Sequence, residues 1–267
     1  MALITVGVGF YMASQSVMDF RLLGSVLLGS LLVGGGSSAL NQYLERDLDL
    51  LMLRTKARPL PAGRVAPASA LIFGVATATL GAAILVLFTN LLTAFLAVSL
   101  LISYIFVYTP LKRKTPLCTL IGAVPGALPP LIGWAAATGT LSAGAWSLFG
   151  ILFFWQLPHF FSFAWFYRDD FARAGFKMLP VLDPTGERTS KNILATLVLL
   201  IAASSLPTVL AMTGWYYFAG SLIVGGIFLA LALPIVINKS MLTAKRIFHV
   251  SLIYLPVLLA MLVLGKR

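Results

Sequence analysis

Acidic residues and cysteine are scarce in this sequence of 267 residues. There are eight Asp and Glu against 19 Lys and Arg, and the one cysteine is Cys118. A single cysteine excludes an intramolecular disulfide and a cysteine-ligated metal site. Charged residues make up only 10% of the chain, so no segment forms a soluble module with its own core. The alternating apolar pattern of an outer-membrane barrel is also missing.

Long apolar runs make up most of the sequence. The chain is 60% hydrophobic with a mean hydropathy of +0.98, and its runs have the length of about 20 residues that a helix needs to cross a bilayer. We therefore predict an all-α, polytopic membrane protein with nine transmembrane helices in one domain, residues 1–267. The first run lacks a basic leader and a small-residue cleavage site, so we interpret it as a spanning helix and not as a signal peptide. The predicted spans are 2–18, 22–40, 68–89, 91–108, 118–137, 145–166, 192–212, 215–237 and 249–265.

Basic residues gather in alternate loops. Loops 41–67, 109–117, 167–191 and 238–248 hold 16 of the 19 Lys and Arg, whereas the loops between them hold only Arg21. By the positive-inside rule these four loops face the cytoplasm, which indicates a bacterial inner membrane. The net charge of +11 thus reflects the orientation of the chain in the membrane. Without aromatic residues interleaved among the cations, it does not indicate nucleic-acid binding.

Seven of the eight acidic residues form two clusters at basic loops. Ionisable groups at a membrane are costly and are functional by default. Two carboxylate clusters among many cations are typical of a divalent metal that holds a phosphorylated substrate. The first cluster is Glu45, Asp47 and Asp49; the second is Asp169, Asp170, Asp183 and Glu187.

The first cluster places three oxygen-bearing side chains on one stripe. Asn41, Glu45 and Asp49 follow an i, i+4, i+8 spacing, which keeps them within about 80° of one helix face. Asp47 points away from that face. Carboxylate and amide oxygens are suitable ligands for Mg²⁺, which completes its shell with water and phosphate. The alternative is an amphipathic helix end whose acids only pair with neighbouring arginines.

Two further sets of residues are candidates for binding a phosphate group. Arg54 and Arg58 are placed to bind diphosphate oxygens after the first cluster. Tyr108 and Lys112, at the end of another span, can reach the same phosphate. The alternative for this second pair is an interfacial tyrosine with a topology-setting lysine.

The second cluster ends a polar and aromatic stripe. On a regular helix, His159, Tyr167 and Asp170 lie within about 80° of one another. Asp169 can pair with Arg173 at i+4, so we select Asp170 as the second metal ligand. His159 has three open interpretations: a packing residue, a proton carrier or a ligand of an iron centre.

Three segments resemble the UbiA prenyltransferase superfamily and, within it, the members that farnesylate haem B. They are NQYLERDLDLLMLRTKARPLPAGR (41–64), YTPLKRKTPLCTLIGAVPGALPPLIGWAAATG (108–139) and FFWQLPHFFSFAWFYRDDFARAGFKMLPVLDPTGERT (153–189). The resemblance covers essentially the whole chain. It implies a nine-helix UbiA-type bundle with a central cavity open to the cytoplasmic side and to lipid. There Mg²⁺, held by two Asp-rich motifs, binds a prenyl diphosphate.

The family motifs map onto the residues selected above. Asn41, Glu45 and Asp49 match the first Asp-rich motif, with Glu in place of its middle Asp. Tyr108 and Lys112 match a Tyr-x-x-x-Lys element.

The second Asp-rich motif is incomplete. Four residues after Asp170 the chain has Ala174. Asp169 or Asp183 would have to supply the missing oxygen.

The resemblance also implies an activity. A farnesyl group would pass from farnesyl diphosphate to the 2-vinyl group of haem B, giving haem O and diphosphate, with haem B as substrate and not cofactor. Phe163, Trp155 and Tyr167 are candidates to face the allylic cation. Arg168, Arg173 or Lys177 would pair with haem propionates. A haem A synthase or a terminal oxidase assembly is an implied partner. The implied catalytic residues are Asn41, Glu45, Asp49, His159 and Asp170.

Two alternatives stay open at this point. One is prenylation of an aromatic quinone precursor or a chlorin. The other is a haem or prenyl-lipid carrier without chemistry. Carriers place charged sites at the bilayer midplane, whereas the carboxylates here lie near one membrane face.

Overall fold

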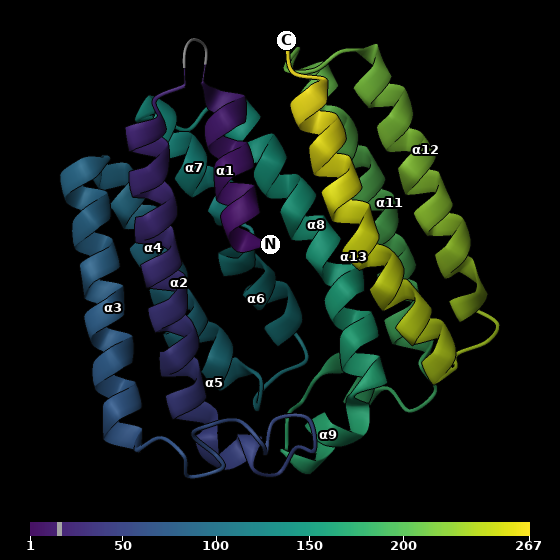
Figure 1. Cartoon of the computed structure of the whole chain (residues 1–267). Coiled ribbons are helices and arrows are strands. Elements are labelled where there is room, and N and C mark those ends of the chain that lie inside the picture. The colour runs from purple at the N-terminus through teal and green to yellow at the C-terminus, as the bar shows by residue number, and fades with distance from the viewer. Residues whose placement is uncertain (15–17) are drawn as a thin grey trace.

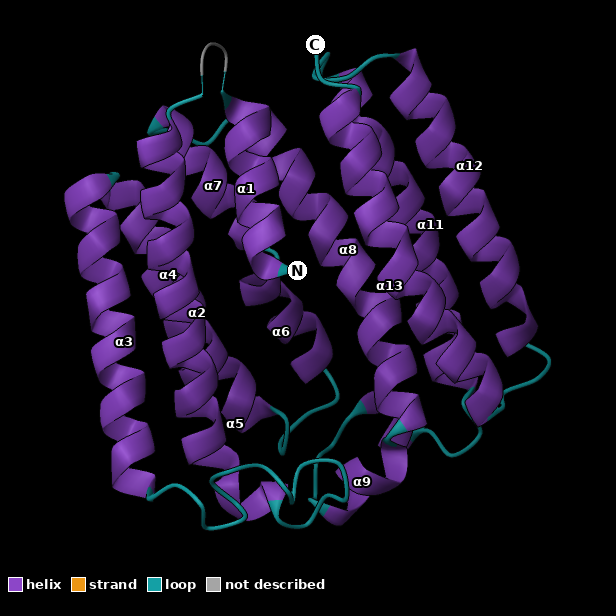
Figure 2. Cartoon of the chain, in the orientation of Figure 1, coloured by secondary structure: helices purple, strands orange, loops and turns teal. Residues whose placement is uncertain are grey.

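A computed structural model describes residues 1–14 and 18–267, and the regular structure of these residues is helical (Figures 1 and 2). Eight helical spans in the described residues are long and apolar enough to cross a membrane, and α1 is a shorter apolar helix. This agrees with the predicted polytopic all-α class and approximately with nine spans. The helices are α1 (Ala2–Ala13), α2 (Phe20–Asp49), α3 (Pro67–Phe88), α4 (Leu91–Ile102), α5 (Thr109–Leu111), α6 (Cys118–Gly126), α7 (Pro129–Thr138), α8 (Ala143–Phe166), α9 (Arg168–Arg173), α10 (Leu179–Leu182), α11 (Glu187–Val209), α12 (Trp215–Ala232) and α13 (Met241–Leu264), with a π-helical segment at Ser103–Tyr108 and a 3₁₀ turn at Leu233–Ile235.

The helices form two groups, with α1 and α7 between them (Figure 1). α2 packs along α3, and α8 packs against α11 and α13, while α1 and α7 cross between the groups (Figure 1). One end of the bundle, here called the basic end, carries the long connections 50–66, 112–117 and 167–186. At this end the connection after α2 meets α9 (Figure 1).

Several helices extend beyond their predicted bounds. α2 continues to Asp49, beyond the predicted end of its span at residue 40, so the first acidic cluster lies on the last turns of this helix. α13 begins at Met241, which makes most of the predicted loop 238–248 helical. The reason is a cap, because the Ser240 side chain accepts a hydrogen bond from the backbone N–H of Thr243.

Two predicted spans are shorter or divided. α1 ends at Ala13, and residues 15–17 of the predicted span 2–18 lie outside the described residues. The predicted span 118–137 is two helices, α6 and α7, separated at Ala127 and Leu128. Pro129 and Pro130 have no N–H to continue the helical ladder, which explains the interruption.

Candidate functional site

A cavity of about 170 Å³ opens at the basic end. Its walls come from α2, the π-helical segment Ser103–Tyr108, Lys112 just after α5, α6, α8, and the connections 50–66 and 167–186. It therefore joins both groups of helices. The lining residues are Asn41, Glu45, Asp49, Met52, Arg54, Arg58, Tyr104, Tyr108, Lys112, Thr119, Phe160, Phe163, Ala164, Phe171, Phe176 and Met178.

The stripe predicted on α2 faces this cavity. Asn41, Glu45 and Asp49 are buried and line it, whereas Asp47 has an exposed side chain. The three inward side chains follow one another along the last turns of the helix, and this single-face arrangement is the one that their spacing predicts.

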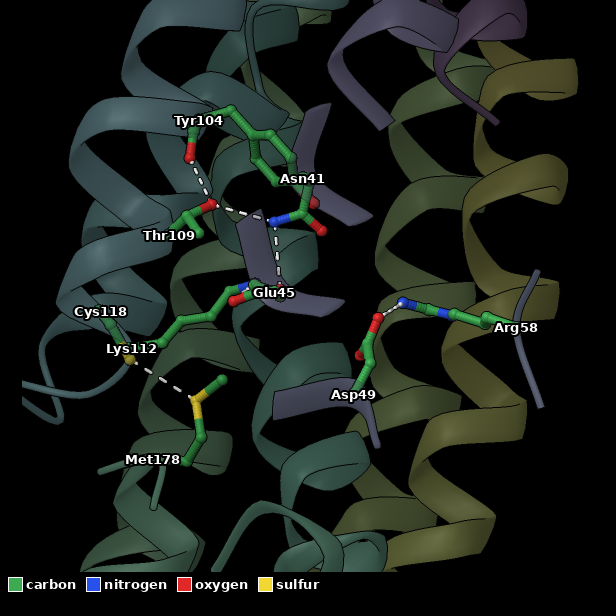
Figure 3. A network of polar contacts seen from close by, with 9 residues as sticks. All are labelled: Asn41, Glu45, Asp49, Arg58, Tyr104, Thr109, Lys112, Cys118 and Met178. Carbon is green, nitrogen blue, oxygen red and sulfur yellow. Dashed lines mark hydrogen bonds and ion pairs between the residues drawn. The ribbon is translucent and has the colours of Figure 1, made fainter. Parts of the chain in front are cut away.

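Glu45 is held by a cation and an amide. Lys112 Nζ lies 3.0 and 2.9 Å from the two Glu45 carboxylate oxygens, and Asn41 Nδ2 donates to one of them at 3.1 Å. Asn41 Nδ2 also donates to the Thr109 hydroxyl, which itself donates to the Tyr104 carbonyl at 2.9 Å (Figure 3). These contacts connect α2 to the π segment.

Asp49 has a separate partner. Arg58 Nη1 lies 2.9 Å from Asp49 Oδ2, with the Asp49 side chain almost fully buried (Figure 3). The Thr55 hydroxyl donates to the Asp49 carbonyl at 2.9 Å, which folds the connection after α2 back toward the helix. The pairing of acids with neighbouring arginines is thus present, but it lies in the wall of a cavity.

Arg54 adds a cation that has no carboxylate partner in the described contacts. Its guanidinium lies over the rings of Phe163 and Tyr167, 5.3 and 5.4 Å from their centroids. Desolvation, and then the charge of Arg58, lower the pKa of Arg54. A lowered pKa means that the positive charge is disfavoured there, and a bound anion would relieve this.

Tyr108 supports Lys112. The Lys112 ammonium lies 4.7 Å from the Tyr108 ring centroid, a distance at which a cation is attracted to the ring face. Gly122 of α6 makes room for the ring, because a Cβ there would lie 2.4 Å from Tyr108 Cδ2. Tyr108 ends the π-helical segment, and such segments are frequent at functional sites.

Asp170 lies outside the cavity lining. Its Oδ1 accepts from the Leu53 N–H at 3.2 Å and its Oδ2 from the Arg54 N–H at 3.1 Å, and Arg173 pairs with it as well. Among the described residues no three His, Cys, Asp or Glu side chains are close enough to hold a metal ion. The structure therefore does not bring Asp170 together with Glu45 and Asp49.

The other acids of the second cluster have local roles. Asp169 pairs with Arg168 at 3.7 Å, and the Asp169 side chain is exposed, so neither residue lines the cavity. Asp183 accepts from the backbone and hydroxyl of Thr189, both at 2.8 Å. These hydrogen bonds stabilise the start of α11.

His159 packs between α8 and α13. Its Nδ1 lies 2.7 Å from the Ser251 hydroxyl, and its ring stacks on Trp155 and Phe248. It is absent from the cavity lining, although its neighbour Phe160 is part of it. The three interpretations of His159 stay predictions.

Sequence reasoning missed several lining residues. Tyr104 precedes Tyr108 and Lys112 at the same spacing of four, a signal that could have identified it. Phe176 and Met178 follow α9 in a connection without periodicity, so only the folded chain reveals them.

The donor set fits a hydrated divalent cation. Buried carboxylate and amide oxygens from α2 are hard ligands, and Mg²⁺ commonly takes one or two protein carboxylates and leaves the rest of its shell to phosphate and water. Three cations and two tyrosines surround them. This combination can bind a metal-complexed diphosphate and disperse the charge of a leaving diphosphate.

Comparison with known sequences agrees with this chemistry. The model of the UbiA prenyltransferase family matches residues 2–260. A protoheme IX farnesyltransferase of Solibacter usitatus is 43% identical over 249 residues, 93% of this chain and 85% of that protein. One of Salinibacter ruber is 43% identical over 254 residues, 95% of this chain and 90% of that protein.

Solved structures share the fold at low identity. A digeranylgeranylglyceryl phosphate synthase has a TM-score of 0.83 at 18% identity, over 99% of this chain and 92% of that one. A UbiA homologue from Archaeoglobus fulgidus, bound to GPP and Mg²⁺, has a TM-score of 0.66 at 17% identity, over 97% of this chain and 94% of that one.

Proposed function

Because the chain belongs to the UbiA prenyltransferase family, we propose that it transfers the farnesyl group of farnesyl diphosphate to the 2-vinyl group of haem B. The products are haem O and diphosphate, which places the reaction in the supply of haem O and haem A to terminal oxidases. The observation that carries the proposal is a cavity where the carboxylates of Glu45 and Asp49 face the cations of Arg54, Arg58 and Lys112. The relatives named for this activity, at 43% identity, support the choice of substrates.

The metal site in this proposal is on α2. Glu45 and Asp49 would hold Mg²⁺, with Asn41 beside them. When bound, the ion would neutralise the diphosphate and so make it a better leaving group. A related structure holds GPP together with Mg²⁺, which supports a metal-bound diphosphate here.

The cations of the cavity would stabilise the leaving group. Lys112 and Arg58 now pair with the two carboxylates and would turn toward the diphosphate oxygens when it binds. Arg54, which lines the same cavity, would add a third donor. As the bond between farnesyl C1 and oxygen breaks, the electron pair leaves with the diphosphate, and these donors stabilise the growing negative charge.

Aromatic side chains would protect the allylic cation. Phe160, Phe163 and Tyr104 line the cavity and offer π-faces in a site poor in water. The vinyl electrons of haem B then form the new carbon–carbon bond. Water adds to the resulting cation and releases a proton, which completes the hydroxyethylfarnesyl group. His159 is proposed to order this water or to contact the haem, and Tyr167 and Arg168 to contact the substrates at the rim.

The proposal treats residues 1–267 as one catalytic domain in the bilayer, with the basic end at the cytoplasmic face of a bacterial inner membrane. The charge asymmetry of the loops supports this orientation. Transfer of the product to a haem A synthase or an oxidase assembly is part of the same proposal.

A reconstituted reaction tests the function. Purified protein in lipid nanodiscs receives farnesyl diphosphate, haem B and Mg²⁺, and mass spectrometry identifies the haem product. We expect haem O together with stoichiometric diphosphate. Prenylation of 4-hydroxybenzoate instead of haem B would favour a quinone-precursor enzyme. Binding of both substrates without diphosphate release would indicate a carrier.

A further inference from the structure

Asp170 is a buried carboxylate whose hydrogen bonds go to another part of the chain. Both of its oxygens accept backbone N–H groups, from Leu53 and Arg54, at 3.2 and 3.1 Å. Arg173 pairs with it from the next turn of α9. Because three donors already use this carboxylate, it serves the connection after α2 and not the cavity.

That connection carries two of the cavity cations. It leaves α2 at Asp49, places Arg54 in the cavity wall and returns Arg58 to Asp49. Thr55 lies six positions after Asp49, and a hydrogen bond joins the two residues. The connection is therefore a tight loop, and the position of each arginine depends on how its backbone is held.

Arg54 is fixed at both ends. Its backbone N–H donates to Asp170, and its guanidinium rests over the rings of Phe163 and Tyr167. All three of these partners lie in one segment, 163–170, which runs from the end of α8 into α9. A single segment thus holds both the backbone and the guanidinium group of Arg54.

We propose that Asp170 is a positioning residue for Arg54, a cation of the cavity wall, and not the second metal ligand that the sequence predicts. The inference rests on the proposed function, in which the ligand of the cavity is a prenyl diphosphate. Arg54 contacts that ligand, and Asp170 acts only through Arg54.

Binding without turnover tests this role. The binding of a non-reactive farnesyl thiodiphosphate is measured in nanodiscs as a function of Mg²⁺ for Asp170→Asn, Asp170→Ala and the control Asp169→Asn, whose side chain is exposed. We expect Asp170→Ala to weaken binding about tenfold, as expected for the loss of hydrogen bonds to a charged group. Asp170→Asn, which retains one acceptor oxygen, should fall between it and the wild type. The Mg²⁺ concentration for half-saturation should not change in any of them.

A double variant and proteolysis separate positioning from metal binding. If Asp170 acts through Arg54, Arg54→Ala with Asp170→Asn binds no more weakly than Arg54→Ala alone, within about twofold. Trypsin should also cut after Arg54 or Lys56 faster in Asp170→Asn than in Asp169→Asn.

A tenfold rise in the Mg²⁺ requirement of Asp170→Asn, or additive losses in the double variant, would overturn the positioning role. Asp170→Asn decides the matter even where Asp170→Ala fails to fold. Failure of the wild-type protein to bind the analogue would instead refute the proposed function.

Discussion

Lys112 and Glu45 form an ion pair in the cavity wall, with 3.0 and 2.9 Å between the ammonium and the two carboxylate oxygens, although they are 67 positions apart in the chain. Both residues are buried, at 7% and 6% exposure. A buried carboxylate that loses its partner is costly, because its charge is neither hydrated nor neutralised. The pair is therefore a structural link between α2 and the end of α5 as well as a part of the site.

Lys112→Met should destabilise the protein by about 3 kcal/mol, because it leaves the Glu45 charge without a partner. The measurement is thermal unfolding in detergent without ligand. Lys114→Met, at an exposed position of the same connection, is the matched control and should change little. Adding Glu45→Gln to Lys112→Met should recover part of the loss. Equal melting temperatures for Lys112→Met and Lys114→Met would show that the pair adds no stability.

Asp49→Asn should lower the rate of haem O formation at least about 100-fold, because it removes a charged ligand from the proposed metal site. Asp47→Asn is the control, since Asp47 lies two residues away with an exposed side chain. Product is quantified by mass spectrometry over a series of Mg²⁺ concentrations. Similar turnover in the two variants would refute a metal site on α2.

Gly122→Ala should disturb Tyr108, because the new methyl group would lie 2.4 Å from Cδ2 of its ring. The displaced ring would move the ammonium of Lys112, and we expect a loss of about tenfold or more in kcat/KM, since small errors of placement are costly in a site of this kind. Gly226→Ala, with open space around its Cβ, should behave as the wild type. Unchanged kinetics in Gly122→Ala would mean that Tyr108 does not position Lys112.

Asp183→Asn should weaken the start of α11 in a pH-dependent way. Burial raises the pKa of Asp183, but hydrogen bonds from Thr189 outweigh it and hold this pKa below its usual range. A lowered folded-state pKa gives stability that is present above the unfolded value of about 4 and is lost as the pH falls through the folded value. At pH 7 we expect a cost of about 1 kcal/mol, as for a lost helix cap. The difference in melting temperature between wild type and variant should begin to shrink as the pH falls below about 4 and should vanish below the lowered pKa of Asp183. A constant difference at all pH values would contradict this.

The single cysteine allows a direct test of orientation. Cys118 is fully buried, so an impermeant maleimide should not label the wild-type protein. Arg113→Cys, at the basic end, should react only in inside-out vesicles, and Thr140→Cys, at the opposite end, only in right-side-out ones. The reverse pattern would place the cavity on the outer face.

The sequence by itself determined the membrane helices, the basic end and the stripe of Asn41, Glu45 and Asp49. Each of these depends on residues that are close in the chain. Hydrophobic length decides whether a helix spans the bilayer, and a spacing of four decides which side chains share a face. Loop charge predicts which end faces the cytoplasm.

Only the tertiary structure decided which partners these residues meet. Asp170 and Tyr167 lie on a common predicted stripe with His159, yet Asp170 binds the backbone of Arg54 while His159 packs against Ser251. The α8 helix ends at Phe166 and the chain turns before α9, so one regular helix does not connect them. Contacts such as Lys112 with Glu45 join segments that are distant in sequence, and helical periodicity within one segment carries no information about which other segment packs against it.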